Sequence, residues 1–159
     1  MRKIVYPFFP KTTASMLPGQ FWSVPLSDGS FACGRVIELC PSDRPGSRVS
    51  FLAGFLDWHS RAEPTFDSIA GAPCLRQGDA HLKTITHCGG PILGLRPLEL
   101  DNIKPDTFRG PLDSSGASSL YVGYKYLRKR RPSDVNLPLQ NTWGYGVLQI
   151  LAEHRFVKS

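Results

Sequence analysis

Four residues in the middle of the chain carry side chains that zinc prefers: Cys74, His81, His87 and Cys88. Structural zinc sites usually hold their ligands in short pairs, such as two cysteines separated by two to four residues. No Cys-x-x-Cys occurs here, and a strand through 81–88 would turn Cys88 away from the two histidines. We therefore expect no metal site and no cofactor, and interpret these residues as buried thiols and surface imidazoles.

Residues suited to nucleophilic catalysis are present but lack the context that catalysis needs. Cys33 lies in an alternating strand pattern and Cys40 precedes a proline, and neither carries a known catalytic signature. Segment 114–116, Ser-Ser-Gly, lacks the Gly-x-Ser-x-Gly pattern, and no glycine-rich phosphate loop occurs. Asp57 and His59 share one face of a strand, where solvation is their expected role. The sequence predicts a protein that is not an enzyme.

A basic run near residue 130 is the strongest binding feature. Five cations fall within seven residues without an acid, and three tyrosines lie just upstream or among them. Bases can stack on such rings while cations meet phosphates, and tyrosine with arginine is also favoured at protein interfaces. A solvated loop, an acidic protein partner and nucleic acid all remain open. The candidate partner-binding residues are Tyr121, Tyr124, Lys125, Tyr126, Arg128, Lys129, Arg130 and Arg131.

The length and charge of the chain limit its domain organisation and its possible partners. The 159 residues fit one domain, spanning 1–159. The 19 basic and 13 acidic residues give a net charge of +6, so the surface attracts anions. No segment reaches the ~18 consecutive apolar residues of a membrane helix. Because Pro7 and Pro10 interrupt the first apolar stretch, we interpret 1–18 as a strand or arm and expect a cytoplasmic protein with reduced thiols.

Short alternating stretches separated by turns dominate the chain. The strongest signal is a hairpin in which strands 20–26 and 31–39 flank an Asp-Gly turn. Further strands are expected at 49–58, 81–87, 92–100 and 120–127, a long loop at 101–119, and a helix at 146–155. This pattern predicts a mainly β fold: a curved antiparallel sheet or a small, partly open barrel with one C-terminal helix.

The hairpin resembles the opening of the bacterial Immunity protein 26 family. That family begins with a glycine, an apolar strand ending in Pro-Leu, a short turn ending in glycine, an aromatic residue and Gly-Arg-Val. The matching positions here are Gly19, Pro25, Leu26, Asp28, Gly29, Phe31, Gly34, Arg35 and Val36. The resemblance covers about the first sixty residues well, and the basic run lies outside it. Independently of the family, Gly34 in a strand indicates a close approach by another group, and Arg35 suits a partly buried ion pair.

The resemblance implies a non-enzymatic bacterial immunity protein that binds and neutralises a cognate toxin. The net positive charge favours a toxin with an acidic face over mimicry of a nuclease substrate. The alternative is a nucleic-acid-binding β-barrel module that uses the basic run. No membrane contact is expected.

Overall fold

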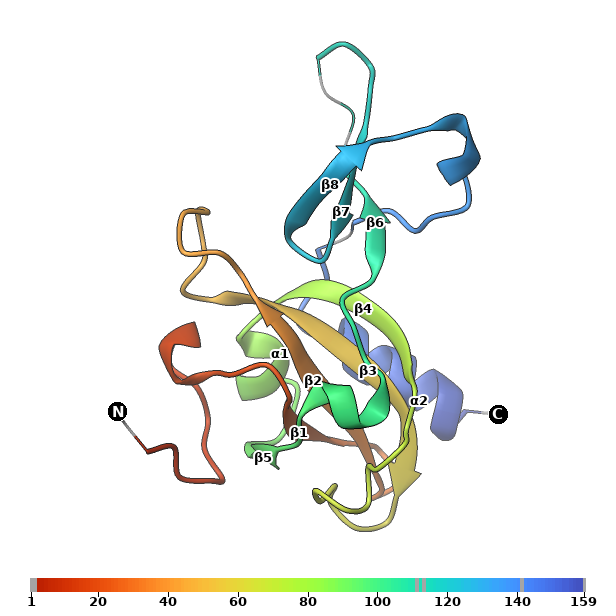
Figure 1. The fold of residues 1–159 in the computed structure, drawn as a ribbon. Helices are drawn as coiled ribbons and strands as arrows, with labels where there is room; N and C mark the ends of the chain where they lie inside the picture. Colours follow the sequence, from red (N-terminus) through yellow and green to blue (C-terminus); the bar gives the residue numbers. More distant parts are fainter. Residues whose placement is uncertain (1–2, 111, 113, 141, 159) are drawn as a thin grey trace.

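The structure, a computed structural model, describes residues 3–110, 112, 114–140 and 142–158. It is mainly β, with two antiparallel sheets and a ten-residue helix close to the C-terminus (Figure 1). The strands are β1 (Gln20–Pro25), β2 (Phe31–Leu39), β3 (Ser50–Ser60), β4 (Cys74–His81), β5 (Ile92–Leu95), β6 (Thr107–Arg109), β7 (Ser119–Val122) and β8 (Lys125–Lys129). The helices are α1 (Lys83–Thr86) and α2 (Val147–Phe156), with 3-10 turns η1 (Thr13–Ser15), η2 (Leu98–Asp101) and η3 (Pro132–Asp134). The predicted fold class is confirmed, and the described strands form open sheets, not a closed barrel.

The larger sheet has five strands in the order β4-β3-β2-β1-β5. Its β1 and β2 form the predicted hairpin, with Trp22 opposite Gly34. The turn closes where expected: the Asp28 carboxylate accepts a hydrogen bond from the Ser30 amide, and Gly29 has a φ of +83°. The strand predicted at 49–58 is β3, an interior strand between β2 and β4.

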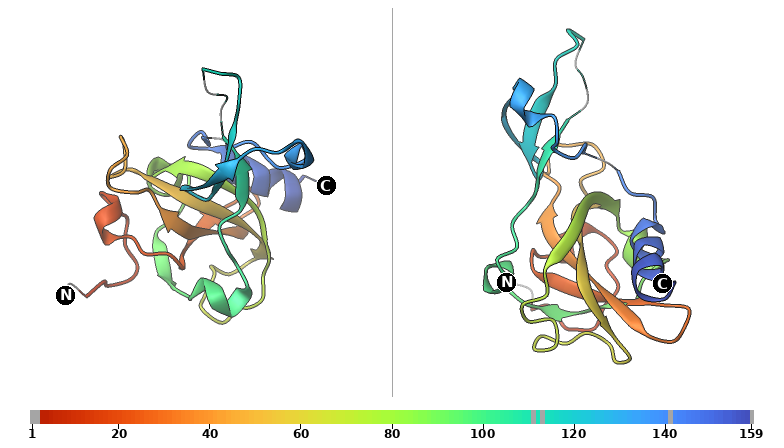
Figure 2. Two further views of the ribbon diagram at one scale, coloured as in Figure 1. Left: turned by 45° about the horizontal axis from the view of Figure 1, so that its top comes forward. Right: turned by 90° about the vertical axis from the view of Figure 1, so that its right-hand side faces the viewer.

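Each face of the five-stranded sheet buries its own core. On β2, Ala32 and Val36 belong to a core with Trp22, whereas Cys33 and Ile37 belong to the opposite core. The first core also contains residues of α2, which packs across that face (Figure 2). A side chain at position 34 would overlap the Trp22 ring, so glycine there makes room for the indole, as the sequence indicated.

The smaller sheet, in the order β6-β7-β8, projects from one end of the five-stranded sheet (Figures 1 and 2). Tyr124, in the turn between β7 and β8, joins the two sheets. Its amide donates to Glu38 Oε1 at 2.8 Å, its hydroxyl donates to the Asp79 carboxylate, and its carbonyl accepts from Arg44 at 2.7 Å. The turn of this hairpin is therefore anchored, while its far end points away from the rest of the molecule.

The strand predicted at 81–87 is wrong. Strand β4 ends at His81, and Lys83–Thr86 forms the short helix α1. Leu82 and Ile85 are both buried, three residues apart. That spacing puts both side chains on one face of a helical turn, whereas in a strand they would point to opposite faces, so it favours the helix.

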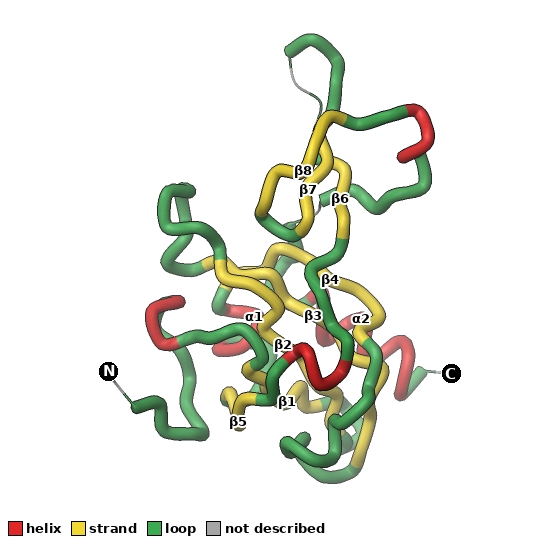
Figure 3. The backbone as a smooth tube through the Cα atoms, viewed as in Figure 1, coloured by secondary structure: helices red, strands yellow, loops and turns green. Residues whose placement is uncertain are grey.

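The single strand predicted at 120–127 is also wrong, because the chain reverses at Gly123 with a φ of +62°. A side chain there would lie 2.8 Å from the Glu38 carboxylate, so the turn requires glycine. The loop predicted at 101–119 is interrupted by β6, and the extended stretch at 92–100 ends at Leu95 before η2. Figure 3 shows how much of this part of the chain is nevertheless loop.

The N-terminal arm pairs with the edge of the five-stranded sheet. The Phe8 amide donates to the Ile92 carbonyl at 3.1 Å, and the Ile92 amide donates to the Phe8 carbonyl at 2.9 Å. Met16, further along the arm, is 1% exposed and belongs to the core beneath α2. The arm therefore covers the outer edge of β5.

Candidate functional site

Five neighbouring residues on and just after β8 point into solvent, and we call them the β8 surface: Lys125, Tyr126, Leu127, Lys129 and Arg131. Tyr126 is 53% exposed and Leu127 is 49% exposed. Four of the five belong to the predicted partner-binding set, and Leu127 joins them. Three exposed cations and two exposed apolar side chains thus follow one another within seven residues; Tyr126 and Lys129 share a face of β8, whereas Lys125, opposite Val122, lies on the other face.

Two other residues of the predicted set are structural. Tyr124 is 5% exposed, and its burial, together with its hydrogen bond to Asp79, raises the pKa of its hydroxyl. Arg128 makes a bidentate pair with Asp134, at 2.8 and 3.1 Å. This hydrogen bonding lowers the pKa of Asp134 to about 2. Tyr124 and Arg128 therefore shape the hairpin and are not free to contact a partner.

The last two predicted residues, Tyr121 and Arg130, are partly covered. The Tyr121 ring packs edge-on against Tyr126, with centroids 6.0 Å apart, and the Arg44 guanidinium lies 5.9 Å from its centroid. The Arg130 amide donates to the Ser118 carbonyl at 2.9 Å. The three tyrosines therefore do not form an open stacking platform.

A β-bulge at Leu127 sets which side chains share a face. Tyr126 is opposite Tyr121 and Arg128 is opposite Leu120, which leaves Leu127 as an extra residue on β8. Cross-strand partners share a face, so Arg128 lies beside the buried Leu120, and Tyr126 lies on the other side. Lys129, opposite Ser119, shares the Tyr126 face.

The outer edge of β8 differs from the other three sheet ends. An additional segment pairs with β4 through the Trp143 amide, with β5 through Phe8, and with β6 through the Gln140 amide. Within the ranges that the structure describes, no segment pairs with the outer edge of β8. The β8 surface therefore borders an open sheet edge.

The residues of the family-like motif support the fold. Arg35 is fully buried, and its Nη1 lies 2.7 Å from Asp101, which also pairs with Arg96 at 2.9 Å. Gly19 has a φ of +97°, and a side chain there would lie 2.8 Å from the Arg96 carbonyl. Leu26 belongs to the core, and the Pro25 carbonyl accepts a hydrogen bond from Gln149. Asp28 and Gly29 form the hairpin turn, and Gly34 makes room for Trp22. The partly buried ion pair expected for Arg35 is present and fully buried.

Asp101 is held ionised inside this cluster. Burial disfavours its charged form, but hydrogen bonds from Arg96, the Gly71 amide and Arg35 outweigh that effect and lower its pKa to about 2. The cluster joins β2 to η2 and to the loop before β4, and explains why this hairpin contains a buried arginine.

One serine, histidine and aspartate lie in contact, a group that the sequence did not reveal because His59 comes 29 positions after Ser30. His59 Nε2 lies 2.6 Å from Ser30 Oγ, and the same hydroxyl contacts Asp28. In a catalytic triad the histidine lies between serine and acid, whereas here the serine is in the middle and is 1% exposed. This arrangement stabilises the turn and does not create a nucleophile.

The thiols, and the cysteine and histidine side chains of the types that bind zinc, are also arranged unfavourably for chemistry. Burial raises the pKa of Cys33, and it raises that of Cys74 to about 11, so these thiols stay protonated. Cys74 and His81 occupy opposite ends of β4, roughly 20 Å apart at the rise of a strand. No group of three potential metal ligands occurs among the described residues.

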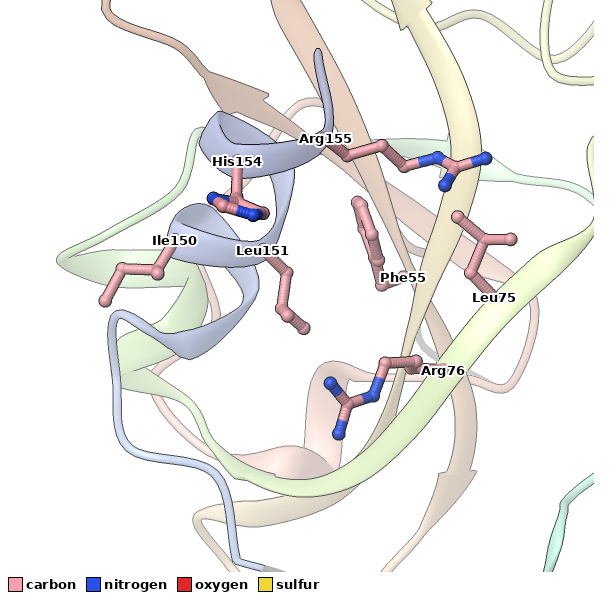
Figure 4. A pocket seen from close by; sticks show the side chains of 7 residues that line it. All are labelled: Phe55, Leu75, Arg76, Ile150, Leu151, His154 and Arg155. Carbon is pink, nitrogen blue, oxygen red and sulfur yellow. The ribbon is translucent and has the colours of Figure 1, made fainter. Parts of the chain in front are cut away.

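A groove between α2 and β4 is a second surface feature, which the sequence analysis missed (Figure 4). Its volume is about 340 Å³. Phe55 of β3 forms its floor, with helix residues on one side and strand residues on the other. The lining residues are Phe55, Leu75, Arg76, Ile150, Leu151, His154 and Arg155.

No family model, curated protein or solved structure matches the chain. These comparisons therefore leave the resemblance to the Immunity protein 26 family untested. Among the described residues, no helix has the length and apolar character needed to span a membrane.

Proposed function

We propose that the protein acts by binding and that its β8 surface contacts an acidic face of a protein partner. The carrying observation is the exposure of Lys125, Lys129 and Arg131 beside Tyr126 and Leu127 at the open end of the small sheet. Complementary charge accelerates encounter and selects partners, and a tyrosine supplies rigid contact area. Segment 104–140 holds seven basic and three acidic residues, so most of the net charge of +6 is concentrated there.

Recognition would use side chains more than strand addition. Lysines and bulges on an edge strand discourage backbone pairing with other chains, and β8 has both. On the face away from Leu120, Tyr126 and Lys129 lie together. A complementary partner surface would therefore offer a carboxylate close to an apolar patch.

The resemblance of the hairpin to the Immunity protein 26 family suggests what the partner is. We propose that the protein is a bacterial immunity protein, that it works in the cytoplasm, and that its partner is a cognate toxin. It would neutralise the toxin by occupying part of its surface, without chemical change to either protein.

Nucleic-acid binding is the competing function, and the geometry favours it less. Stacking would need exposed rings, but Tyr124 is buried and Tyr121 is covered by Arg44 and Tyr126. Single-stranded nucleic acid would find one open ring, that of Tyr126, beside the cations.

The test is capture from the native host with three matched baits. One bait is the natural protein, and one carries Lys125→Glu, Lys129→Glu and Arg131→Glu. The third carries Lys11→Glu, Arg48→Glu and Lys158→Glu, which reverse three exposed cations outside the small sheet. Bound protein is identified, and bound nucleic acid is quantified at about 50 and about 300 mM salt.

We expect a stoichiometric protein that is lost with the first variant, retained with the second, and toxic to cells that lack the bait protein. Equal retention of the protein by both variants would show that the β8 surface does not bind it. Nucleic acid that falls steeply with salt, without a protein, would favour the competing function.

A further inference from the structure

We propose that the groove between α2 and β4 is a second docking site, for a protein segment that carries one large apolar side chain next to a carboxylate. This site is separate from the β8 surface, and the proposal does not depend on the function proposed above.

Helix α2 is held on the side opposite the groove. Glu153 accepts hydrogen bonds from the Ser27 amide at 2.6 Å and from the Ser27 hydroxyl at 2.8 Å, and Gln149 donates to the Pro25 carbonyl at 3.3 Å. These contacts tie the helix to the turn between β1 and β2. The first residues of β4 are left uncovered, with Phe55 of β3 between the two elements (Figure 4).

The walls of the groove are apolar and still exposed. Ile150 on α2 is 67% exposed and Leu75 on β4 is 37% exposed, whereas Phe55 at the floor is 3% exposed. Leu151 adds further apolar surface on the helix side. A guest side chain inserted above Phe55 would be in contact with aliphatic groups on both sides, which favours burial of an apolar group.

The rim of the groove is cationic. Arg76 and Arg155 lie at its two ends, and His154 lies on the helix side (Figure 4). Arg155 is already paired with Asp57, at 3.0 Å. By contrast, the Arg76 guanidinium donates no hydrogen bond to any residue that the structure describes, so it is available to a carboxylate of the guest.

The openness of the groove favours a protein segment over a free small molecule. Small ligands usually bury most of their surface in their sites, and walls as exposed as Ile150 and Leu75 cannot enclose one. For a protein segment, the groove has to cover only the one anchoring side chain, because the remaining residues around it belong to the partner protein. A second copy of this chain is disfavoured, because a twofold contact would bring like-charged rims together.

The experiment is an NMR titration of the full ¹⁵N-labelled chain with three capped tripeptides. The probe is acetyl-Glu-Phe-Glu-amide, and the controls are acetyl-Lys-Phe-Lys-amide and acetyl-Glu-Ser-Glu-amide. We expect saturable shifts, confined to amides around Leu75, Arg76, Ile150 and Leu151, with the probe alone. Equal shifts with either control peptide, scattered shifts or the absence of shifts would overturn the proposal.

Two variants locate the binding on the groove. Ile150→Glu should weaken the probe about tenfold or more, because it removes a wall and repels the carboxylates, and its exposure makes it compatible with folding. Leu100→Glu, at a position 58% exposed on η2, and the β8 charge reversals should leave binding unchanged. Similar weakening by Leu100→Glu would overturn the proposal.

Two additional measurements resolve the competing occupants: a dilution series of the labelled chain without peptide, and a titration with free 3-phenylpropionate. Shifts that depend on protein concentration alone, and vanish in Ile150→Glu, would assign the groove to self-association. Tighter binding of free 3-phenylpropionate than of the peptide would assign it to a small carboxylate. Either result would contradict a protein segment as its occupant.

Discussion

The two sheets of this protein divide stability from exposure. In β2, at the heart of the five-stranded sheet, six of nine residues are buried, whereas none of the five residues of β8 is buried. The larger sheet packs a core on each face, and the smaller one offers cations and apolar side chains to solvent. Because binding surfaces need exposed groups on a firm support, the difference suggests that the first sheet supports and the second recognises.

An arginine–aspartate cluster occurs in each region, in very different surroundings. The side chains of Arg35 and Asp101 are fully buried, whereas that of Arg128, paired with Asp134, is 33% exposed. A buried pair is costly to break because it leaves an uncompensated charge, whereas water and salt reduce the contribution of an exposed pair. Breaking an arginine–aspartate ion pair should therefore strongly reduce the stability of the larger sheet and only weakly reduce that of the smaller one.

The largest effect is expected for Asp101→Asn. The change leaves the buried guanidinium of Arg35 without a charge partner and should cost about 3–5 kcal/mol of unfolding free energy. The matched change beside the small sheet, Asp134→Asn in η3, should cost much less. Chemical denaturation of the two variants measures both values, and equal losses would contradict the comparison between the sheets.

Gly34→Ala should cost about 1–3 kcal/mol, because the new Cβ would overlap the Trp22 ring inside a packed core. In the small sheet, Gly110→Ala brings a Cβ to 2.7 Å from the ring of Tyr121, which is only partly buried and can move. We expect Gly110→Ala to be milder in thermal unfolding. A larger loss of thermal stability for Gly110→Ala than for Gly34→Ala would show that the small sheet is the more rigid of the two.

The pH dependence of stability should also reflect Asp101. Its pKa in the folded protein is about 2, below the ordinary value of 3.8, so the folded state binds fewer protons than the unfolded state between these values. The resulting stabilisation, about 2 kcal/mol, is present above about pH 4 and is lost as the pH falls towards 2. Carboxyl ¹³C titration of Asp101 checks this, and a pKa near 4 would contradict it.

Tyr124→Phe should weaken the connection between the two sheets and have a smaller effect on the global free energy of unfolding. The variant loses the hydrogen bond to the Asp79 carboxylate, worth roughly 1–2 kcal/mol. Hydrogen exchange should accelerate in β7 and β8 and stay unchanged in β2 and β3. Uniform acceleration throughout would mean that the two sheets unfold as one unit.

Local sequence signals predicted the elements whose contacts are local. The Asp28–Gly29 turn with its alternating flanks indicated the β1–β2 hairpin, and helical spacing indicated α2. Strand β4 gave no such signal, because Cys74–His81 has few apolar residues and contains Gly78, which accommodates the Trp143 ring. Its position depends on β3, which no short window reveals.

The candidate site was predictable in composition but not in its division of roles. The basic run and its tyrosines were visible in the sequence, yet nothing local separates Arg128, which pairs with Asp134, from Lys129, which is exposed. The partner of Arg35 is 66 residues away, and the α2–β4 groove joins elements from distant parts of the chain. These features arise only from tertiary packing.

Calorimetric titration of the captured partner tests the central claim most directly. The natural protein is compared with the Lys125→Glu, Lys129→Glu, Arg131→Glu variant and with its matched control at Lys11, Arg48 and Lys158. We expect the β8 variant to bind at least about tenfold more weakly, equivalent to about 1.4 kcal/mol, and the control to bind as the natural protein does. Equal affinities of the two variants would contradict recognition through the β8 surface.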